Sequence, residues 1–224
     1  MDTQHHLIVA HEVTNTGSDR RQMANMAKQT KATLETEELR VVADRGYYRS
    51  EELKDCEEAN ITTHLPKPQT SGNLARGQFG RDAFHYIVED NEYECPAGLR
   101  LVYHTTKQDR GKAVLCYWTY KCRMCNIKAQ CTSGAYRKMT RWEHETVLER
   151  AQARLDRSPD AMRIRRATVE HPFGTLKAWM GSTHFLTKTL DRVSTEMSLH
   201  VLAYNMKRMM NIIGTKSLIE AIGV

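Results

Sequence analysis

The sequence contains no apolar run near the roughly 18 residues that a membrane-spanning helix needs. Residues 1–6 are polar, unlike the start of a secretory signal peptide. Internal repeats and low-complexity tracts are also missing from the sequence. These absences argue against a membrane protein, and we expect a cytoplasmic chain.

Cysteine is scarce as well. Six cysteines in 224 residues are too few for a secreted scaffold that disulfides hold together. Hydrophobic residues make up 40% of the chain and charged residues 27%. This composition supplies enough apolar material for the core of one domain with an insertion, or of two small domains.

Acidic residues are in deficit only in the C-terminal part. The net charge is +6, and residues 136–224 hold 15 Lys and Arg against 9 Asp and Glu. The whole excess of positive charge therefore lies in this part. Such a basic half suggests a polyanionic partner such as nucleic acid, with a solvated helical face as the alternative.

Three short apolar runs rich in β-branched residues predict strands at residues 6–13, 39–43 and 61–65. The segments between them predict two helices, one after the turn at residues 15–19 and one over residues 50–59. This alternation of strands and helices indicates an α/β layer.

The middle of the chain breaks the alternation and is rich in Gly, Tyr and Cys. Alternating residues at 84–88 and 114–120 predict small antiparallel strands. From residue 140 onward the pattern is helical, with amphipathic stretches at 142–155 and 191–213. We therefore expect three parts, at residues 1–68, 69–138 and 139–224.

Two carboxylates stand in motifs that suggest chemistry. Asp44 follows the apolar run 39–43 within Ala-Asp-Arg-Gly-Tyr, and Glu170 stands four residues after Arg166 and seven before Lys177. These motifs resemble those of bacterial insertion-sequence transposases of the DDE class. In that family a strand-end motif of this type holds the second catalytic Asp, and a motif of Arg, three residues, Glu, six residues and Lys holds the catalytic Glu.

The resemblance implies an RNase H-like catalytic domain with Asp44 and Glu170 as ligands of Mg²⁺ or Mn²⁺. Transposases of this class hydrolyse a phosphodiester and then use the freed 3′-OH to attack a second strand. Two divalent ions activate the nucleophile and stabilise the leaving oxygen, and carboxylates suit these hard ions. The implied partners are DNA, as transposon ends and target, and further copies of the chain in a nucleoid-associated assembly.

A basic helix face is expected beside Glu170. Residues 166, 170 and 177 share one face of a helix, so Arg166 and Lys177 can bind DNA phosphates. Arg163 is a further DNA-binding candidate, at a position where related motifs often carry Tyr. The alternatives are a surface ion pair between Arg166 and Glu170 and a solvated basic face. Pro172 leaves the backbone of Glu170 open, because proline disfavours helix at the preceding residue.

The first of the family's three carboxylates is missing. Only 43 residues precede Asp44, and the run 6–13 contains no Asp. Asp2 is the only early candidate, and its context predicts a turn; Asp44 itself also fits a turn. We therefore expect an incomplete RNase H-like fold that has lost its N-terminal strands. The functional hypothesis is a truncated DDE transposase, with an inactive DNA-binding remnant as the alternative.

Four of the five cysteines in the middle segment are candidate metal ligands, with Cys116 or His104 as an alternative for one of them: Cys95, Cys122, Cys125 and Cys131. Four thiolates with one Cys-x-x-Cys pair favour tetrahedral Zn²⁺, which would stabilise a small zinc-ribbon-like β module. An iron–sulfur cluster and reduced, unliganded thiols are the alternatives. We expect the aromatic residues around Tyr117 to pack across strands rather than to stack on bases.

Overall fold

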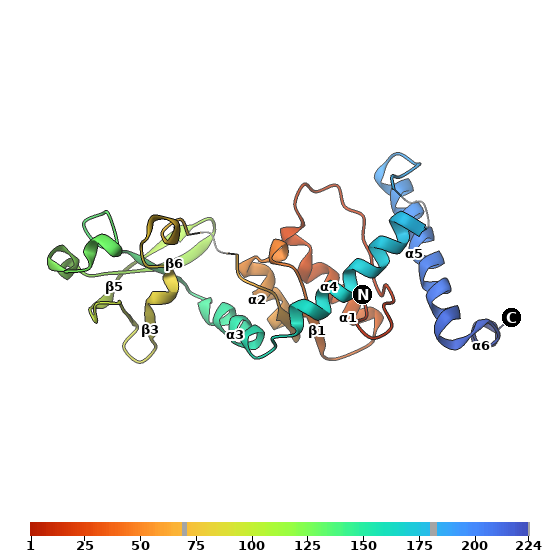
Figure 1. The fold of residues 1–224 in the computed structure, drawn as a ribbon, viewed down its shortest axis with the longest axis horizontal. Helices are drawn as coiled ribbons and strands as arrows, with labels where there is room; N and C mark the ends of the chain where they lie inside the picture. Colours follow the sequence, from red (N-terminus) through yellow and green to blue (C-terminus); the bar gives the residue numbers. More distant parts are fainter. Residues whose placement is uncertain (69–70, 180–182, 224) are drawn as a thin grey trace. The chain divides into compact units, whose positions relative to one another are not determined.

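The computed structural model describes residues 1–68, 71–179 and 183–223 (Figure 1). The chain has a mixed α/β fold that divides into two compact units. One unit combines Met1–Pro68 with Val147–Val224, and the other is the insert Gln69–Thr146. Among the described residues, no helix has both the length and the apolar character needed to cross a membrane.

A parallel strand pair forms the α/β part of the first unit. Strand β1 (Leu39–Val42) pairs with β2 (Ile61–His64), and the helix α2 (Ser50–Glu58) connects them. The buried side chains of Leu53 and Cys56 give α2 its apolar face. The two predicted strands and the helix between them are confirmed.

Helix α1 (Met23–Thr33) begins against a carboxylate from α2. The buried Glu52 accepts a hydrogen bond of 2.8 Å from the backbone N–H of Ala24. The first N–H groups of a helix have no partner within it, so Glu52 satisfies one of them and places negative charge at the positive end of the helix dipole. At the other end, Lys31 donates to the carbonyl of Ala59. These bonds tie α1 to the βαβ unit.

The predicted strand at residues 6–13 is wrong. This segment has no regular secondary structure and lies along the helix α5 (Leu190–Ile213). The side-chain amide of Asn205 accepts from the N–H of Ile8 at 2.9 Å and donates to its carbonyl at 2.9 Å. Tyr204 donates to the carbonyl of His6. With no described strand beside the segment, helix side chains satisfy its backbone groups instead.

The C-terminal part is helical. It contains α3 (Glu145–Asp156), α4 (Ala161–Gly174) with a π-helical extension η7 (Thr175–Trp179), then α5 and α6 (Thr215–Ile222). The predicted helix at 191–213 is confirmed. The predicted helix start at 142 is wrong, because residues 139–142 pair with a strand of the insert and α3 begins only at Glu145.

The insert is an antiparallel sheet of five strands within the described residues, in the order β3-β4-β5-β6-β7. Arg110 and Gly111 both have positive φ, of 52° and 79°, at the turn between the two longest strands. A two-residue turn with positive φ at both positions matches the right-handed twist of a hairpin. The strands are His85–Ile87, Glu92–Glu94, Arg100–Asp109, Lys112–Trp118 and Met139–Trp142.

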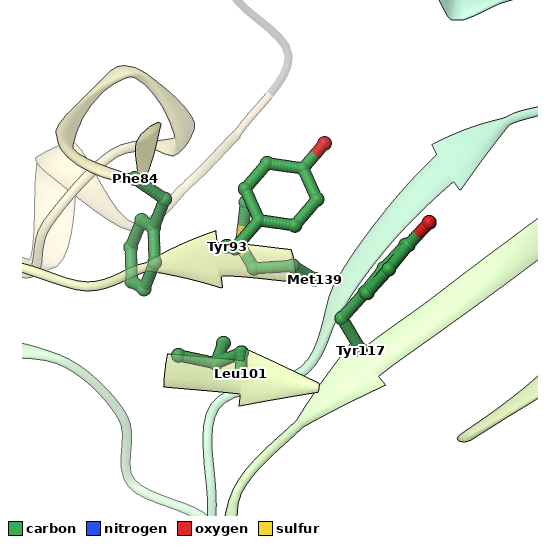
Figure 2. Close-up of a cluster of buried hydrophobic side chains, with 5 residues drawn as sticks. All are labelled: Phe84, Tyr93, Leu101, Tyr117 and Met139. Atoms are coloured by element: carbon green, nitrogen blue, oxygen red, sulfur yellow. The ribbon is translucent and has the colours of Figure 1, made fainter. Parts of the chain in front are cut away.

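An aromatic cluster fills the core of the insert (Figure 2). The ring of the fully buried Tyr117 meets that of Tyr93 edge-on, with centroids 5.2 Å apart. Neighbouring Trp118 stacks on His104 at 3.8 Å and on Tyr136 at 5.7 Å. The expectation of cross-strand packing is confirmed for Tyr117. The cluster consists of Phe84, Tyr93, Leu101, Tyr117 and Met139.

Candidate active site

Asp44 lies just beyond the end of β1, where the chain turns. It is the N-cap of a short 3₁₀ turn, Arg45–Tyr47, and its Oδ1 accepts from the N–H of Gly46 at 3.3 Å. Its side chain is 43% exposed, which leaves it accessible to a ligand. Asp44 therefore stabilises a turn, as its sequence context also predicted. This contact uses Oδ1 and leaves Oδ2 available for another contact.

Arg165 of α4 makes that contact. Its guanidinium donates to Oδ2 of Asp44 at 3.1 Å, in an ion pair between two segments of the first unit. Burial raises the pKa of Tyr47, and the charges of Asp19 and Asp44 add to the effect while Arg165 opposes it. A phenol and a guanidinium thus lie beside the strand-end carboxylate.

Sequence reasoning missed Arg165 as the partner of Asp44. The spacing of residues along α4 could have identified it. Ala161, Thr168 and Pro172 are buried, and Arg165 falls between them at the same spacing of three and four residues. A cation on the buried stripe of a helix requires an anionic partner, and α4 contacts β1 directly before Asp44.

The residues of the sequence motif lie on exposed parts of α4 and of its extension η7, which carries Lys177. Arg163, Arg166, Glu170 and Lys177 are all exposed. At about 100° per residue, Glu170 lies about 140° around the helix axis from Arg165. Arg166, Glu170 and Lys177 are exposed, and the α4 side chain that reaches Asp44 is Arg165.

Pro172 lies inside α4, and the helix continues through it. Proline has no N–H to donate to the carbonyl four residues earlier, which is that of Thr168. The Thr168 hydroxyl is itself turned back to the carbonyl of Ile164 at 2.9 Å. Glu170 is therefore in helical conformation, and Lys177 stands on the π-helical turn that follows.

Two candidate residues have local partners. Arg163 pairs with Asp160 one turn earlier, at 3.1 Å. Asp2 accepts from the backbone N–H groups of Gln4 and His5 and from the His5 ring. Burial alone would raise the pKa of Asp2, but these hydrogen bonds outweigh it and lower the pKa. Asp2 thus forms a turn, as its sequence context predicts.

Among the described residues, metal-ligating groups are not gathered around Asp44. In the part of the chain that the structure describes, no three His, Cys, Asp or Glu side chains lie in positions to hold a metal ion together. The guanidinium of Arg165 lies where a cation would approach Oδ2 of Asp44. The described residues therefore do not form a complete divalent-metal site.

The four predicted cysteine ligands are brought together in the insert. Cys95, Cys122, Cys125 and Cys131 line one cavity. Burial raises the pKa of Cys131; Arg137 opposes this, and the other three thiols reinforce it. Among the described residues, no three of these thiols lie in positions to hold a metal ion together.

The remaining cysteines lie away from this cavity. Cys116 is buried in β6 and its thiol faces the carbonyl of Val114 at 3.7 Å. Cys56 is buried in α2, where burial raises the pKa of its thiol to about 12. Both behave as small core residues, because a thiol that solvent cannot reach is a poor nucleophile and a poor ligand.

A family model described as transposase DDE domain matches residues 1–206. This range includes Asp44, Glu170 and the cysteine insert. Comparisons with curated proteins and with solved structures gave no match.

Proposed function

Because the chain belongs to the transposase DDE domain family, we propose that it cleaves and joins DNA strands, with Asp44 and Glu170 as its catalytic carboxylates. The observation that carries the proposal is the family match, which spans nearly the whole chain and both motifs. The exposure of both carboxylates supports it. The parallel pair β1–β2, with its connecting helix, is consistent with part of an RNase H-like sheet.

DNA binding is proposed for the exposed basic residues of α4 and η7. Arg166 of α4 and Lys177 of η7 flank Glu170 in the sequence, and Arg163 lies almost one turn before Arg166. Arginine suits phosphate because its planar guanidinium donates two parallel hydrogen bonds. The ion pair of Arg163 with Asp160 is exposed, so exchanging Asp160 for a phosphate costs little. The excess positive charge of residues 136–224 supports the same assignment.

Mg²⁺ or Mn²⁺ is proposed as the cofactor, with Asp44 and Glu170 as ligands. Carboxylate oxygens are the ligands that these ions prefer. The arrangement of the described residues does not fit such a site, because Arg165 pairs with Asp44, Glu170 faces away from that pair, and three ligands do not converge. We therefore assign no step of the reaction to a metal, and expect a cation at Asp44 to compete with Arg165.

A second candidate function is DNA binding without strand cleavage. The same two observations favour it, since a carboxylate held by an arginine and an incomplete ligand set describe an inactive centre. In this case the basic residues of α4 and η7 would still bind duplex DNA through its phosphates, with strong dependence on salt.

Self-association is proposed through α5. This helix exposes a stripe of large apolar residues at spacings of three and four, which water solvates poorly. A second copy of the chain offers the same stripe and can cover it symmetrically. The stripe consists of Leu199, Leu202, Met206, Met210 and Ile213.

Binding and cleavage measured on the same duplex separate the two functions. We expect Arg166→Ala combined with Lys177→Ala to weaken DNA binding at least tenfold and to lower its salt dependence. Lys216→Ala, a fully exposed lysine of α6, is the matched control and should leave binding unchanged. Binding with Mn²⁺-dependent nicking supports the transposase, and binding without nicking supports the second candidate. Unchanged binding in the double variant would contradict the assignment to α4.

A further inference from the structure

The insert contains a cavity that four cysteine thiols line: those of Cys95, Cys122, Cys125 and Cys131. We propose that this cavity binds one Zn²⁺ ion through the four thiolates and that the ion stabilises the fold of the insert. The proposal is independent of the reaction at Asp44, because the thiols belong to the unit Gln69–Thr146 and Asp44 to the other unit.

The backbone presents the thiols from tight turns. Cys95 follows β4, and its N–H donates to the carbonyl of Leu99 at 3.0 Å. Its own carbonyl accepts from Gly98 at 2.8 Å. Gly98 has a φ of +71°, a conformation that glycine adopts without strain. This turn reverses the chain within four residues and fixes the direction of the Cys95 side chain.

The second turn holds two thiols. The N–H of Cys125 donates to the carbonyl of Cys122 at 3.3 Å, so the Cys-x-x-Cys segment closes on itself. A three-residue spacing across such a turn places both side chains on the same side. Cys131 ends the following 3₁₀ turn, where its N–H bonds to the carbonyl of Lys128 at 2.9 Å. Short turns that each deliver one or two thiols are the usual frame of a structural zinc site.

The cavity also supplies positive charge. Arg137 donates to the carbonyl of Cys131 at 3.1 Å and to that of Phe79 at 3.3 Å. Lys128 lines the same cavity. A zinc ion bound by four thiolates carries a net charge of about −2, and these two cations compensate it. Binding forms four Zn–S bonds and releases four thiol protons to solvent, so affinity falls at low pH.

The thiols must rearrange to bind the ion. Tetrahedral zinc needs all four sulfur atoms at about 2.3 Å from one point. The four thiols line one cavity, but no three of the described side chains lie in positions to hold a metal ion together. The turns that carry Cys122, Cys125 and Cys131 contain no β-ladder, so they can close without disturbing the sheet. Zinc should therefore order these turns and stabilise the insert.

Metal content of the full chain tests the proposal. The protein, expressed with zinc in the medium, should contain one zinc per chain by mass spectrometry of the elements. Replacement by Co²⁺ should give the absorption bands of a tetrahedral, all-thiolate site. Cys122→Ser and Cys131→Ser should lose the metal, whereas Cys56→Ala and Cys116→Ala, whose thiols lie outside the cavity, should keep it.

Three results would overturn the assignment. A wild-type chain free of metal that takes up no Co²⁺ would do so. Iron with inorganic sulfide would instead identify an iron–sulfur cluster. A disulfide among the four cysteines in the freshly purified protein would indicate redox chemistry.

If the serine variants fail to fold, addition of a chelator to the wild-type chain tests whether the metal stabilises the insert. The proposal expects the thermal unfolding of the insert to shift to lower temperature, and an unchanged transition contradicts it.

Discussion

The Asp44 carboxylate makes two contacts, a hydrogen bond within a turn and an ion pair with Arg165. One oxygen caps the turn at Gly46, and the other pairs with Arg165. The sequence allowed the position of Asp44 at a strand end to be predicted, because a polar residue after a buried run marks that boundary. Its partner could not be predicted, since Arg165 and Asp44 stand 121 positions apart and only the tertiary fold brings them together.

Removing Arg165 should favour a cation at Asp44. We expect Arg165→Ala to raise the affinity of the free chain for Mn²⁺, because a competing guanidinium is lost. The free energy of unfolding should fall by only about 0–1 kcal/mol, as the pair is partly exposed. Calorimetric titration with Mn²⁺ and urea unfolding measure the two effects. The control is Arg157→Ala, because Arg157 lies between α3 and α4 and donates to the carbonyl of Ala153. Weaker Mn²⁺ binding in Arg165→Ala would refute the competition between the guanidinium and the cation.

Sequence patterns predicted helices and strands correctly where the interactions that stabilise the element lie within a few residues of it. The helix α2 and the strands on either side of it were predictable, because capping and periodicity lie within a few residues. The run at residues 6–13 has the composition of a strand, yet a strand forms only beside another one. In its place, α5 supplies Asn205 and Tyr204, which no pattern in residues 6–13 could reveal.

Asn205 should be needed to hold this N-terminal segment. Asn205→Ala removes both hydrogen bonds to Ile8 and should lower the free energy of unfolding by about 1–3 kcal/mol. Hydrogen exchange at the amide of Ile8 should accelerate. The control is Ser198→Ala, on the same helix as Asn205. It removes an exposed contact between Ser198 and His11 and should have little effect. Unchanged exchange at Ile8 would show that the segment is held by other contacts.

The attachment of the chain before α5 should depend on pH through Glu196. Its carboxylate accepts from the N–H of Leu186 and from the N–H and hydroxyl of Thr187. These bonds, led by that of Leu186, lower the pKa of Glu196 below its ordinary 4.5. The stabilisation is therefore complete above pH 4.5 and is lost as the pH falls through the lower folded-state pKa.

Amide exchange at Leu186 and Thr187 measures this effect. It should increase on acidification from about pH 7 to about pH 3 relative to amides within α5, after correction for the intrinsic rate. Glu196→Gln should remove the pH dependence, because an amide does not titrate in this range. A pH dependence that survives in Glu196→Gln would assign it to another group.

At the scale of the whole molecule, charge and apolar surface suggest assembly on DNA. Composition alone predicted a basic C-terminal half, and the structure adds an exposed apolar stripe on α5. The first of the three expected carboxylates could not be located from the sequence, and the described residues do not bring three ligands together. The residues of a site that is assembled from distant parts of the chain cannot be identified from local sequence periodicity.

Self-association should follow the apolar stripe of α5. We expect the chain to form dimers or larger species whose population rises with concentration, measured by light scattering after gel filtration. Leu202→Glu with Met206→Glu should shift the chain to monomer, because burying two carboxylates in an apolar contact is costly. Leu74→Glu, an exposed leucine of the insert, is the control. A monomeric wild-type chain at every concentration would rule the interface out.

The most direct test of the central claim is strand transfer by the purified chain. Labelled duplex DNA carrying candidate element ends is incubated with Mn²⁺ and a target plasmid, and joined products are counted. We expect joining by the wild-type chain, a loss of at least a hundredfold in Asp44→Asn and in Glu170→Gln, and no loss in Glu220→Gln. Joining that survives either of the first two substitutions would contradict the roles proposed for Asp44 and Glu170.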